Sequence, residues 1–257
     1  MSEQGRLFVV GLGPGAREAM TAQALEAIRR AEVVIGYDGY FAGIAELVEG
    51  KECLALPLTR ETDRARLAVQ RLRAGQVVCV ISSGDPGIYA MASLVLEFAA
   101  GEDEWLLDDI AIVPGVSAVN AAAALLGAPL GHDFAVVSLS DLLTPWDVIE
   151  RRLRAAAEAD FVVALLNPKS RRRDWQYRRA AEILARHRSA EVPVGVVRNA
   201  YRPGQAVEIT TVEHMTEAAV DMFTTVIVGN SQTRRFGNVV VTPRGYVVEG
   251  RRDDAAG

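Results

Sequence analysis

The chain has 257 residues, of which 50% are apolar, 24% are charged and 6% are aromatic. This composition supports one or two buried cores, and it excludes a short peptide module and a disordered chain. The formal net charge of −5 argues against broad binding to nucleic acid or to anionic membrane, because both need a positive field over a large surface. We therefore expect a protein that works on small molecules.

The two cysteines, Cys53 and Cys79, stand in apolar runs with no CxxC spacing and no histidine nearby. We expect both to be free, buried thiols, as in a reducing compartment. The N-terminal residues carry no basic stretch before an apolar run, and no apolar run approaches the ~20 residues of a membrane span. These features predict a cytoplasmic protein.

Short β-branched runs alternate with helical patterns along the first half of the chain. The expected strands are Leu7–Val10, Val33–Ile35, Cys53–Leu56, Val77–Ile81 and Ile110–Val113. Between them, Glu61–Ala74 is amphipathic, and Gly75 suits the position just after a helix. This alternation predicts a parallel sheet wrapped by helices.

The pattern changes after Pro114. Ser117–Leu126 is an expected alanine-rich helix that ends at Gly127, and Thr144, Pro145 and Asp147 suit the N-cap, N1 and N3 positions of a later helix. Further strands are expected at Phe134–Ser138, Phe161–Leu166, Val194–Val197, Val207–Thr211 and Thr225–Val228. The turn-rich segment Arg202–Gln205 favours a hairpin, so this half is predicted to hold a mixed sheet.

The overall prediction is a two-domain α/β protein. An N-terminal domain with a parallel sheet is placed at residues 1–113, and a C-terminal mixed α/β domain at residues 114–243. Residues 244–257 are charged and small, and we expect a loose tail there.

A glycine-rich loop follows the first expected strand. Gly11-Leu12-Gly13-Pro14-Gly15-Ala16 formally fits the dinucleotide pattern GxGxx(G/A), with Asp38 where a ribose-binding acid would stand. The dinucleotide fold needs a helix that starts within the glycine turn, whereas the first convincing helix cap here is Thr21. We interpret the segment as a loop that exposes its backbone. A tight turn without a ligand stays open as the alternative.

Two more loops of this kind follow later strands. Ser82–Tyr89 leaves the fourth strand and Pro114–Ala118 leaves the fifth. In open α/β sheets, ligands bind outside the carboxyl ends of the strands. Asp85 also fits an Asx turn, and Ser117 also fits a helix cap, so neither residue alone indicates a site. Three glycine-containing loops at strand exits together favour one shared ligand site.

The string Asn167-Pro168-Lys169-Ser170-Arg171-Arg172-Arg173 leaves a strand and enters a helix. Positive charge at a helix N-terminus opposes the helix dipole, so local stability does not favour it there. Both a solvated basic face and a polyanion-binding patch stay open. No histidine has metal-ligand spacing and no Ser/His/Asp arrangement stands out, so we expect neither a metal site nor an acyl-transfer hydrolase.

Several strings together resemble the tetrapyrrole methylase family. They are Gly11–Gly15, Ser83–Ala92 and Val113–Ala118, in this order and spacing. Further strings are similar to those of its carbon-17 methyltransferases of cobalamin synthesis: His132–Phe134, Ser138–Trp146, Asn167–Ser170 and Gly229–Thr233. The resemblance covers nearly the whole chain, from about Arg6 to Thr242.

The resemblance implies a homodimeric enzyme that binds S-adenosylmethionine between two α/β domains. Its reaction would be methylation at carbon 17 of a tetrapyrrole, taking precorrin-3B to precorrin-4 with ring contraction; cobalt-factor III stays open as the substrate. By matching position, the cofactor contacts would be Pro14, Ser83, Gly84, Asp85, Ile88, Ser117, Ala118, Asn167 and Ala200.

Other roles are left as hypotheses. Ring contraction moves a proton, and the loop carboxylates Asp85, Asp133 and Asp141 are candidates for acid–base help. The substrate's carboxylate arms would suit the basic side chains of Lys169, Arg171, Arg172 and Arg173. A nucleotide-binding oxidoreductase, which would read Gly11–Ala16 as its cofactor loop, and a non-catalytic binding module stay open as alternatives.

Overall fold

The computed structural model describes residues 5–170 and 173–246. The described residues form two compact units. The first contains the chain up to Ala121 together with Asn199–Gln205, and the second contains Ala122–Arg198 together with the chain from Ala206 onward. The division follows Ala121, inside a helix, whereas the sequence places it near Val113.

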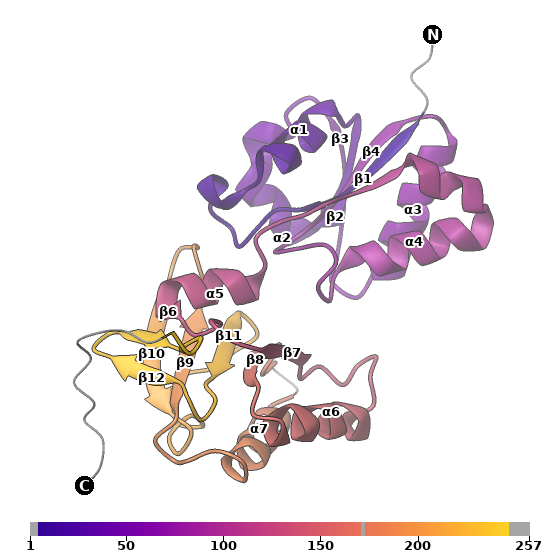
Figure 1. Cartoon of the computed structure of the whole chain (residues 1–257). Helices are drawn as coiled ribbons and strands as arrows, with labels where there is room; N and C mark the ends of the chain where they lie inside the picture. The colour runs from indigo at the N-terminus through magenta and orange to yellow at the C-terminus, as the bar shows by residue number, and fades with distance from the viewer. Residues whose placement is uncertain (1–4, 171–172, 247–257) are drawn as a thin grey trace, which may run out of the picture. The chain divides into compact units, whose positions relative to one another are not determined.

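The first unit is built on a five-stranded parallel sheet (Figure 1). Its strands are β1 (Arg6–Gly11), β2 (Val33–Tyr37), β3 (Glu52–Leu56), β4 (Val77–Ser82) and β5 (Ile110–Val113), in the spatial order β3-β2-β4-β1-β5. The helices are α1 (Ala22–Arg30), α2 (Asp38–Phe41), α3 (Glu61–Arg73) and α4 (Met91–Glu102), with short 3₁₀ turns at Arg17–Ala19, Ala42–Leu47 and Glu104–Asp109. The predicted parallel sheet wrapped by helices is confirmed.

The central strand β4 shows why its sequence is apolar throughout. Val78 and Val80 lie in the core with α3 and α4, while Cys79 and Ile81 lie in the core on the opposite face, with α1. Successive side chains of a strand point to opposite faces, so a strand that is covered on both sides needs no polar positions. All six residues of β4 are buried.

The predicted helix limits in this unit are also confirmed. The Thr21 hydroxyl accepts a hydrogen bond from the backbone N–H of Ala24 at 3.0 Å, so α1 begins well after the glycine turn. Helix α3 ends at Arg73, and Gly75 follows with φ +79°, a left-handed conformation that glycine adopts without strain.

The second unit holds the predicted mixed sheet. The strands β7 (Phe134–Ser138), β8 (Val162–Leu166), β9 (Pro193–Arg198), β10 (Ala206–Thr211) and β11 (Thr224–Val228) have the order β10-β9-β11-β8-β7. In this sheet, β7 and β8 run parallel to each other and the other neighbouring strands are antiparallel. The strands β9 and β10 form the expected antiparallel pair. Residues of α6 (Trp146–Glu158) and α7 (Trp175–Ala185) pack on one face of the sheet in a shared core.

A small three-stranded sheet in this unit was not predicted. It consists of β6 (Gly127–Ala128), which directly follows α5 (Ala118–Leu126), together with β12 (Arg234–Phe236) and β13 (Val239–Val241). Strands of two or three residues carry too little periodicity to be recognised in a sequence.

Two local predictions were wrong. Pro145 takes the N-cap position of α6 rather than N1, and its carbonyl accepts from the N–H groups of Val148 and Ile149 at 3.1 and 3.3 Å. Cys79 is buried as expected, but Cys53 is exposed, because β3 is an edge strand. Among residues 5–170 and 173–246, no helix is long and apolar enough to cross a membrane.

Candidate functional site

Three loops meet at the carboxyl ends of β4, β1 and β5, which are neighbours in the sheet of the first unit. The backbones of Gly13 and Gly84 exchange two hydrogen bonds, at 3.1 and 2.7 Å. A Cβ at Gly115 would lie 2.2 Å from the Gly84 carbonyl oxygen, and one at Gly11 would lie 2.5 Å from the same atom. Only glycine permits this approach, and we call the meeting of Gly11, Gly13, Gly84 and Gly115 the glycine junction.

The carboxylate of Asp85 fastens two of these loops together. One oxygen accepts from the backbone N–H of Gly87 at 2.8 Å, which makes the Asx turn that the sequence allowed. The other oxygen accepts from the N–H of Gly115 at 3.1 Å and so reaches the exit of β5. Asp85 is therefore a positioning residue for the glycine junction in this structure.

The glycine junction is less crowded at Gly84 than at Gly11 or Gly115. Gly84 has φ +68°, and a Cβ there would point toward the first turn of α5, with the nitrogen of Ala118 at 3.6 Å and Cα of Ser117 at 3.8 Å. The first N–H groups of a helix have no partners within the helix, so they are available to a polar or anionic ligand group. The Ser117 hydroxyl itself accepts from the N–H of Asn120 at 3.1 Å, as a cap does.

The segment that contains Ala200 belongs to the first unit. Its neighbour Arg202 donates a guanidinium hydrogen bond to the carbonyl oxygen of Pro14. The side chain of Arg202 also covers Gly15, where a Cβ would lie 2.5 Å from Arg202 Cγ. Asn199 and Tyr201 both have positive φ, of 50° and 57°, so the backbone on either side of Ala200 is strained. No local pattern predicts the contact between Arg202 and Pro14, because the two residues are far apart in the chain.

In the second unit, two loops leave the parallel neighbours β7 and β8. The side-chain amide of Asn167 donates to the Ser138 hydroxyl at 3.0 Å, and the N–H of Leu139 donates to the Leu166 carbonyl at 2.9 Å. Asn167 has φ +51°. The strings around Ser138 and Asn167, which the sequence singled out separately, are therefore one structural cluster of this unit.

The basic residues between Asn167 and Arg173 lie in different surroundings. Arg173 donates to the carbonyl oxygen of Leu139 at 2.6 Å and lies 3.9 Å from the Asp141 carboxylate, with 11% of its side chain exposed. Burial lowers the pKa of Arg173, and the charge of Asp141 opposes that shift. The Lys169 ammonium stands 5.4 Å from the centre of the Tyr177 ring. Arg171 and Arg172 lie outside the described residues.

The three candidate carboxylates have different surroundings. Asp85 is occupied in the glycine junction, and Asp141 accepts from the buried amide of Gln176 at 2.8 Å. Asp133 is exposed and stands 3.5 Å from the ring of His132. Asp133 precedes β7 and Asp141 follows it, so about 13 Å of strand separates them.

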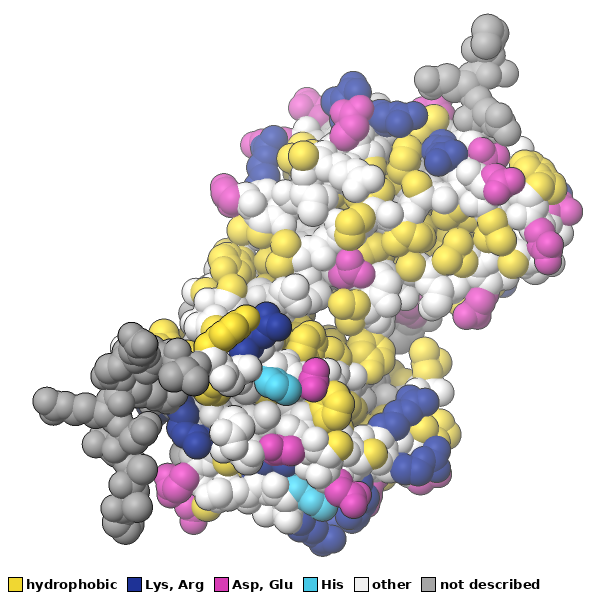
Figure 2. Space-filling model, in the orientation of Figure 1, with side chains coloured by type: hydrophobic (Ala, Val, Ile, Leu, Met, Phe, Trp, Pro, Cys, Tyr) yellow, Lys and Arg dark blue, Asp and Glu magenta, His cyan; other side chains and the backbone are white. Residues whose placement is uncertain are grey.

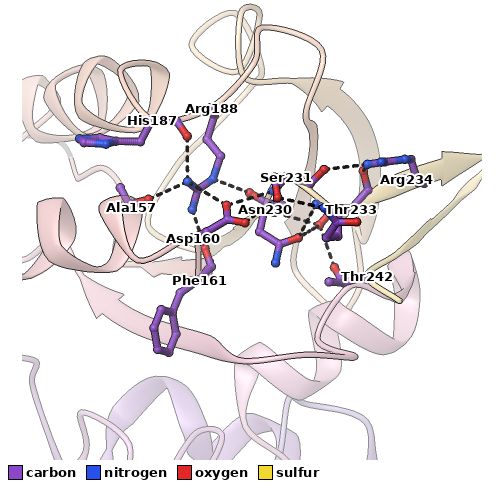
Figure 3. Close-up of polar contacts among 12 residues, drawn as sticks. Ala157, Asp160, Phe161, His187, Arg188, Asn230, Ser231, Thr233, Arg234 and Thr242 are labelled. Carbon is purple, nitrogen blue, oxygen red and sulfur yellow. Dashed lines mark hydrogen bonds and ion pairs between the residues drawn. The ribbon is translucent and has the colours of Figure 1, made fainter. Parts of the chain in front are cut away.

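The string Gly229–Thr233 is tied into a polar network around a buried arginine (Figure 3). Arg188 donates to the carbonyl oxygens of Gly229, Ala157, Phe161 and His187 at 2.7 to 3.1 Å and pairs with Asp160 at 3.2 Å. The other Asp160 oxygen accepts from the Ser231 hydroxyl at 2.6 Å. Burial lowers the pKa of Arg188, and the nearby Asp160 charge opposes this. The network joins the end of α6 to the exit of β11.

Residues 6–216 match the family model of tetrapyrrole (corrin/porphyrin) methylases. The chain belongs to the tetrapyrrole methylase family. This methylase is 44% identical to the precorrin-3B C(17)-methyltransferase of Sinorhizobium sp, over 94% of its own length and 97% of the relative's. It is 46% identical to the cobalt-factor III methyltransferase of Priestia megaterium over 95% of its length, but it spans only 45% of that longer protein.

A solved structure agrees with this membership. The methyltransferase CobJ superposes on the methylase with a TM-score of 0.88 at 41% identity, over 93% of this chain and 100% of CobJ. The glycine junction and the cluster of Ser138 and Asn167 lie within the residues that the family model matches. The methylase differs from a dinucleotide-binding fold, because α1 begins at Ala22 and not within the glycine turn.

Proposed function

We propose that the protein is an S-adenosylmethionine-dependent methyltransferase that methylates carbon 17 of a precorrin or cobalt-precorrin in cobalamin synthesis. The observation that carries the proposal is the glycine junction, which holds three strand exits at backbone contact and sets Gly84 beside the backbone of the first turn of α5. The chain is similar over nearly its whole length to a precorrin-3B C(17)-methyltransferase and to a cobalt-factor III methyltransferase, and this similarity supports the same reaction.

The residues of the first unit fit the cofactor. Backbone groups around Ser83 and Gly84, the first turn of α5 at Ser117 and Ala118, and the loop at Pro14 would hold it, with Ile88 at the rim and Ala200 from the strained segment. A Cβ at Gly84 would lie at van der Waals distance from the backbone of Ser117 and Ala118. The assignment of Asn167, in the second unit, is carried by the family resemblance.

The methyl transfer step depends mainly on how the protein positions the two reactants. S-adenosylmethionine supplies an electrophilic methyl group, and an enamine-like ring carbon is already a good nucleophile. The protein then contributes by holding the reactants in line, which lowers a barrier by up to ~7–11 kcal/mol. Ring contraction further needs a proton to move, and exposed Asp133 and the internally bonded Asp85 and Asp141 are the proposed candidates.

The anionic arms of the substrate need cations. We propose that Lys169, Arg171 and Arg172 contact the carboxylate arms of the substrate. Arg173 would have to contact the substrate while its guanidinium also bonds the Leu139 carbonyl and pairs with Asp141. The relatives act on precorrin-3B or cobalt-factor III by name, so the substrate is proposed as one of these two.

The decisive experiment has two steps. Calorimetry with S-adenosylhomocysteine and, separately, with NAD first tests the cofactor: binding of the first and not the second is expected, and the reverse would favour the oxidoreductase. Parallel assays with precorrin-3B and with cobalt-factor III then show which substrate is methylated. Methylation of neither, by a protein that binds S-adenosylhomocysteine, would overturn the proposed reaction.

A homodimer and a cytoplasmic location complete the proposal. Leu142 and Leu143 are 80% and 99% exposed on the loop after β7, where a partner surface would remove them from water. Sedimentation at micromolar concentration should give the mass of two chains, and a monomer alone would count against the dimer. Cell fractionation should recover the protein with the cytoplasmic enzymes.

A further inference from the structure

A small pocket lies at one edge of the sheet in the second unit. Its volume is about 220 Å³, and its lining comes from the segments before β7, before β8 and after β11, including His132, Asp133, Asp160, Phe161, Asn230 and Gln232. Because β8 runs parallel to β7 and antiparallel to β11, these three segments meet at the same edge. Ser138 and Asn167 stand at the other ends of β7 and β8, so the length of β7, about 13 Å, separates them from the pocket.

Asn230 presents an unused hydrogen-bond donor to this pocket. The residue is 6% exposed, and its side-chain oxygen accepts from the N–H of Gln232 at 3.0 Å and from the Thr233 hydroxyl at 3.1 Å. A backbone N–H can only donate, so the amide oxygen faces this turn and the amide nitrogen faces away from it. Figure 3 shows the nitrogen pointing away from the network, and no described residue hydrogen-bonds to it. A largely buried donor without a partner is costly, so the amide needs an acceptor in the pocket.

The charged groups of the pocket are acidic. Asp160 is compensated, because Arg188 pairs with it at 3.2 Å. Asp133 is 77% exposed, and the ring of His132 beside it accepts the Asp133 backbone N–H at Nδ1 at 2.8 Å, as a neutral imidazole does. Figure 2 likewise shows acidic side chains next to histidines on the lower body, which the second unit forms. The described lining holds no lysine or arginine, so the charge of Asp133 is uncompensated.

These groups disfavour several kinds of ligand. A carboxylate or phosphate would meet the charge of Asp133 with no free cation to offset it. A metal ion is not favoured either, because no three His, Cys, Asp or Glu side chains within residues 5–170 and 173–246 are grouped as ligands. Pockets for drug-sized molecules have volumes of about 300–1,000 Å³, so this pocket suits a smaller molecule. The complementary ligand is a small organic cation that also carries an oxygen acceptor.

We propose that the pocket binds a protonated amine that carries a carbonyl or hydroxyl oxygen. The ammonium group lies beside the carboxylate of Asp133, and the oxygen accepts from the amide nitrogen of Asn230. Phe161, which is partly buried in the pocket wall, covers the carbon atoms of the ligand. The site does not depend on the proposed methyl transfer, and it assigns Asp133 to binding rather than to acid–base chemistry.

The test uses small probes that differ in their charged and polar groups. Glycinamide carries both the ammonium group and a carbonyl oxygen, whereas propylamine lacks the oxygen, acetamide lacks the charge and glycine adds a carboxylate. Each is titrated into the whole ¹⁵N-labelled chain, and the side-chain amide signals of Asn230 report on the site. Asp133→Asn removes the charge, and Asn230→Asp keeps the oxygen that holds the turn. The matched control is Asp174→Asn, because Asp174 is also exposed in the second unit but lies outside the pocket.

Glycinamide should bind the wild type with a Kd of about 1 mM or below, and the other three probes should bind at least about tenfold more weakly. Asp133→Asn should bind glycinamide at least about tenfold more weakly than the wild type does, and Asp174→Asn should match the wild type. Asn230→Asp should lose the preference for glycinamide over propylamine. Calorimetry with S-adenosylhomocysteine should give wild-type affinity for every variant.

Unshifted Asn230 signals at about 10 mM glycinamide would overturn the site. Wild-type affinity for glycinamide in Asp133→Asn would overturn it too. Because Asp133 is exposed, its variant decides the question even if Asn230→Asp does not fold. Failure to methylate a tetrapyrrole would refute the proposed function and leave this site standing.

Discussion

The carboxylate of Asp85, at the exit of β4, accepts a hydrogen bond from the backbone N–H of Gly115, at the exit of β5, at 3.1 Å. Strand β1 lies between these two strands. The contact therefore spans β1, and it fixes the spacing of the loops on either side of the glycine junction.

Asp85→Ala removes both acceptors of this contact and should loosen the β5 exit. We expect S-adenosylhomocysteine affinity to fall at least about tenfold, and the free energy of unfolding to fall by about 1–3 kcal/mol, because two N–H groups lose a charged partner. Calorimetry and urea unfolding measure the two effects. Asp85→Asn, which keeps one acceptor oxygen, should recover part of both, and full affinity in Asp85→Ala would contradict the positioning role.

Gly84→Val should abolish S-adenosylhomocysteine binding, because the added side chain would occupy the region beside the Ser117 and Ala118 backbone where the cofactor is proposed to bind. The left-handed backbone adds about 1–3 kcal/mol of strain, so stability must be separated from binding. Gly75→Val is the matched control: Gly75 has φ +79° with nothing within 4 Å of its would-be Cβ, at the other end of β4. Both variants should lose similar stability, and only Gly84→Val should lose binding. Equal affinity in the two would refute the site.

Arg173→Ala should destabilise the second unit by about 1.5–3 kcal/mol, since a largely buried guanidinium holds the Leu139 carbonyl and the Asp141 carboxylate. The control is Arg178→Ala, whose exposed pair with Asp174 is worth about 0–1 kcal/mol. Chemical denaturation measures both. If Arg173→Ala were as stable as the control and weakened tetrapyrrole binding instead, Arg173 would be a substrate contact.

The Glu150 carboxylate should make the free energy of unfolding depend on pH. Hydrogen bonds from Arg179 and Arg154 lower the pKa of this carboxylate to about 2. Its stabilising contribution is therefore present above the unfolded pKa of ~4.3 and is lost as the pH falls toward 2. The difference in unfolding free energy between wild type and Glu150→Gln should be largest near neutral pH and shrink below about pH 4.5. Glu182→Gln, which removes the more exposed partner of Arg179, should show a smaller difference. A difference independent of pH would reject this assignment.

The sequence predicted the features that local pattern determines. Runs such as Val77–Ile81 are apolar because both faces of β4 are covered, and Thr21 and Gly75 mark helix limits by their own chemistry. The spatial order of the strands and the contact of Arg202 with Pro14 depend on residues distant in the chain, which no local pattern reports. The sequence left Arg173 open between a solvated basic face and a polyanion-binding patch, because its partners, Leu139 and Asp141, belong to another loop.

The glycine junction also limits how this enzyme could be altered. Its contacts are made by main-chain atoms, so a side chain added at Gly11 or Gly115 would collide with a neighbouring backbone. New specificity has to come from side chains on the same strand exits. A directed-evolution library should therefore leave Gly11 and Gly115 unchanged and vary positions of the same loops that already carry side chains.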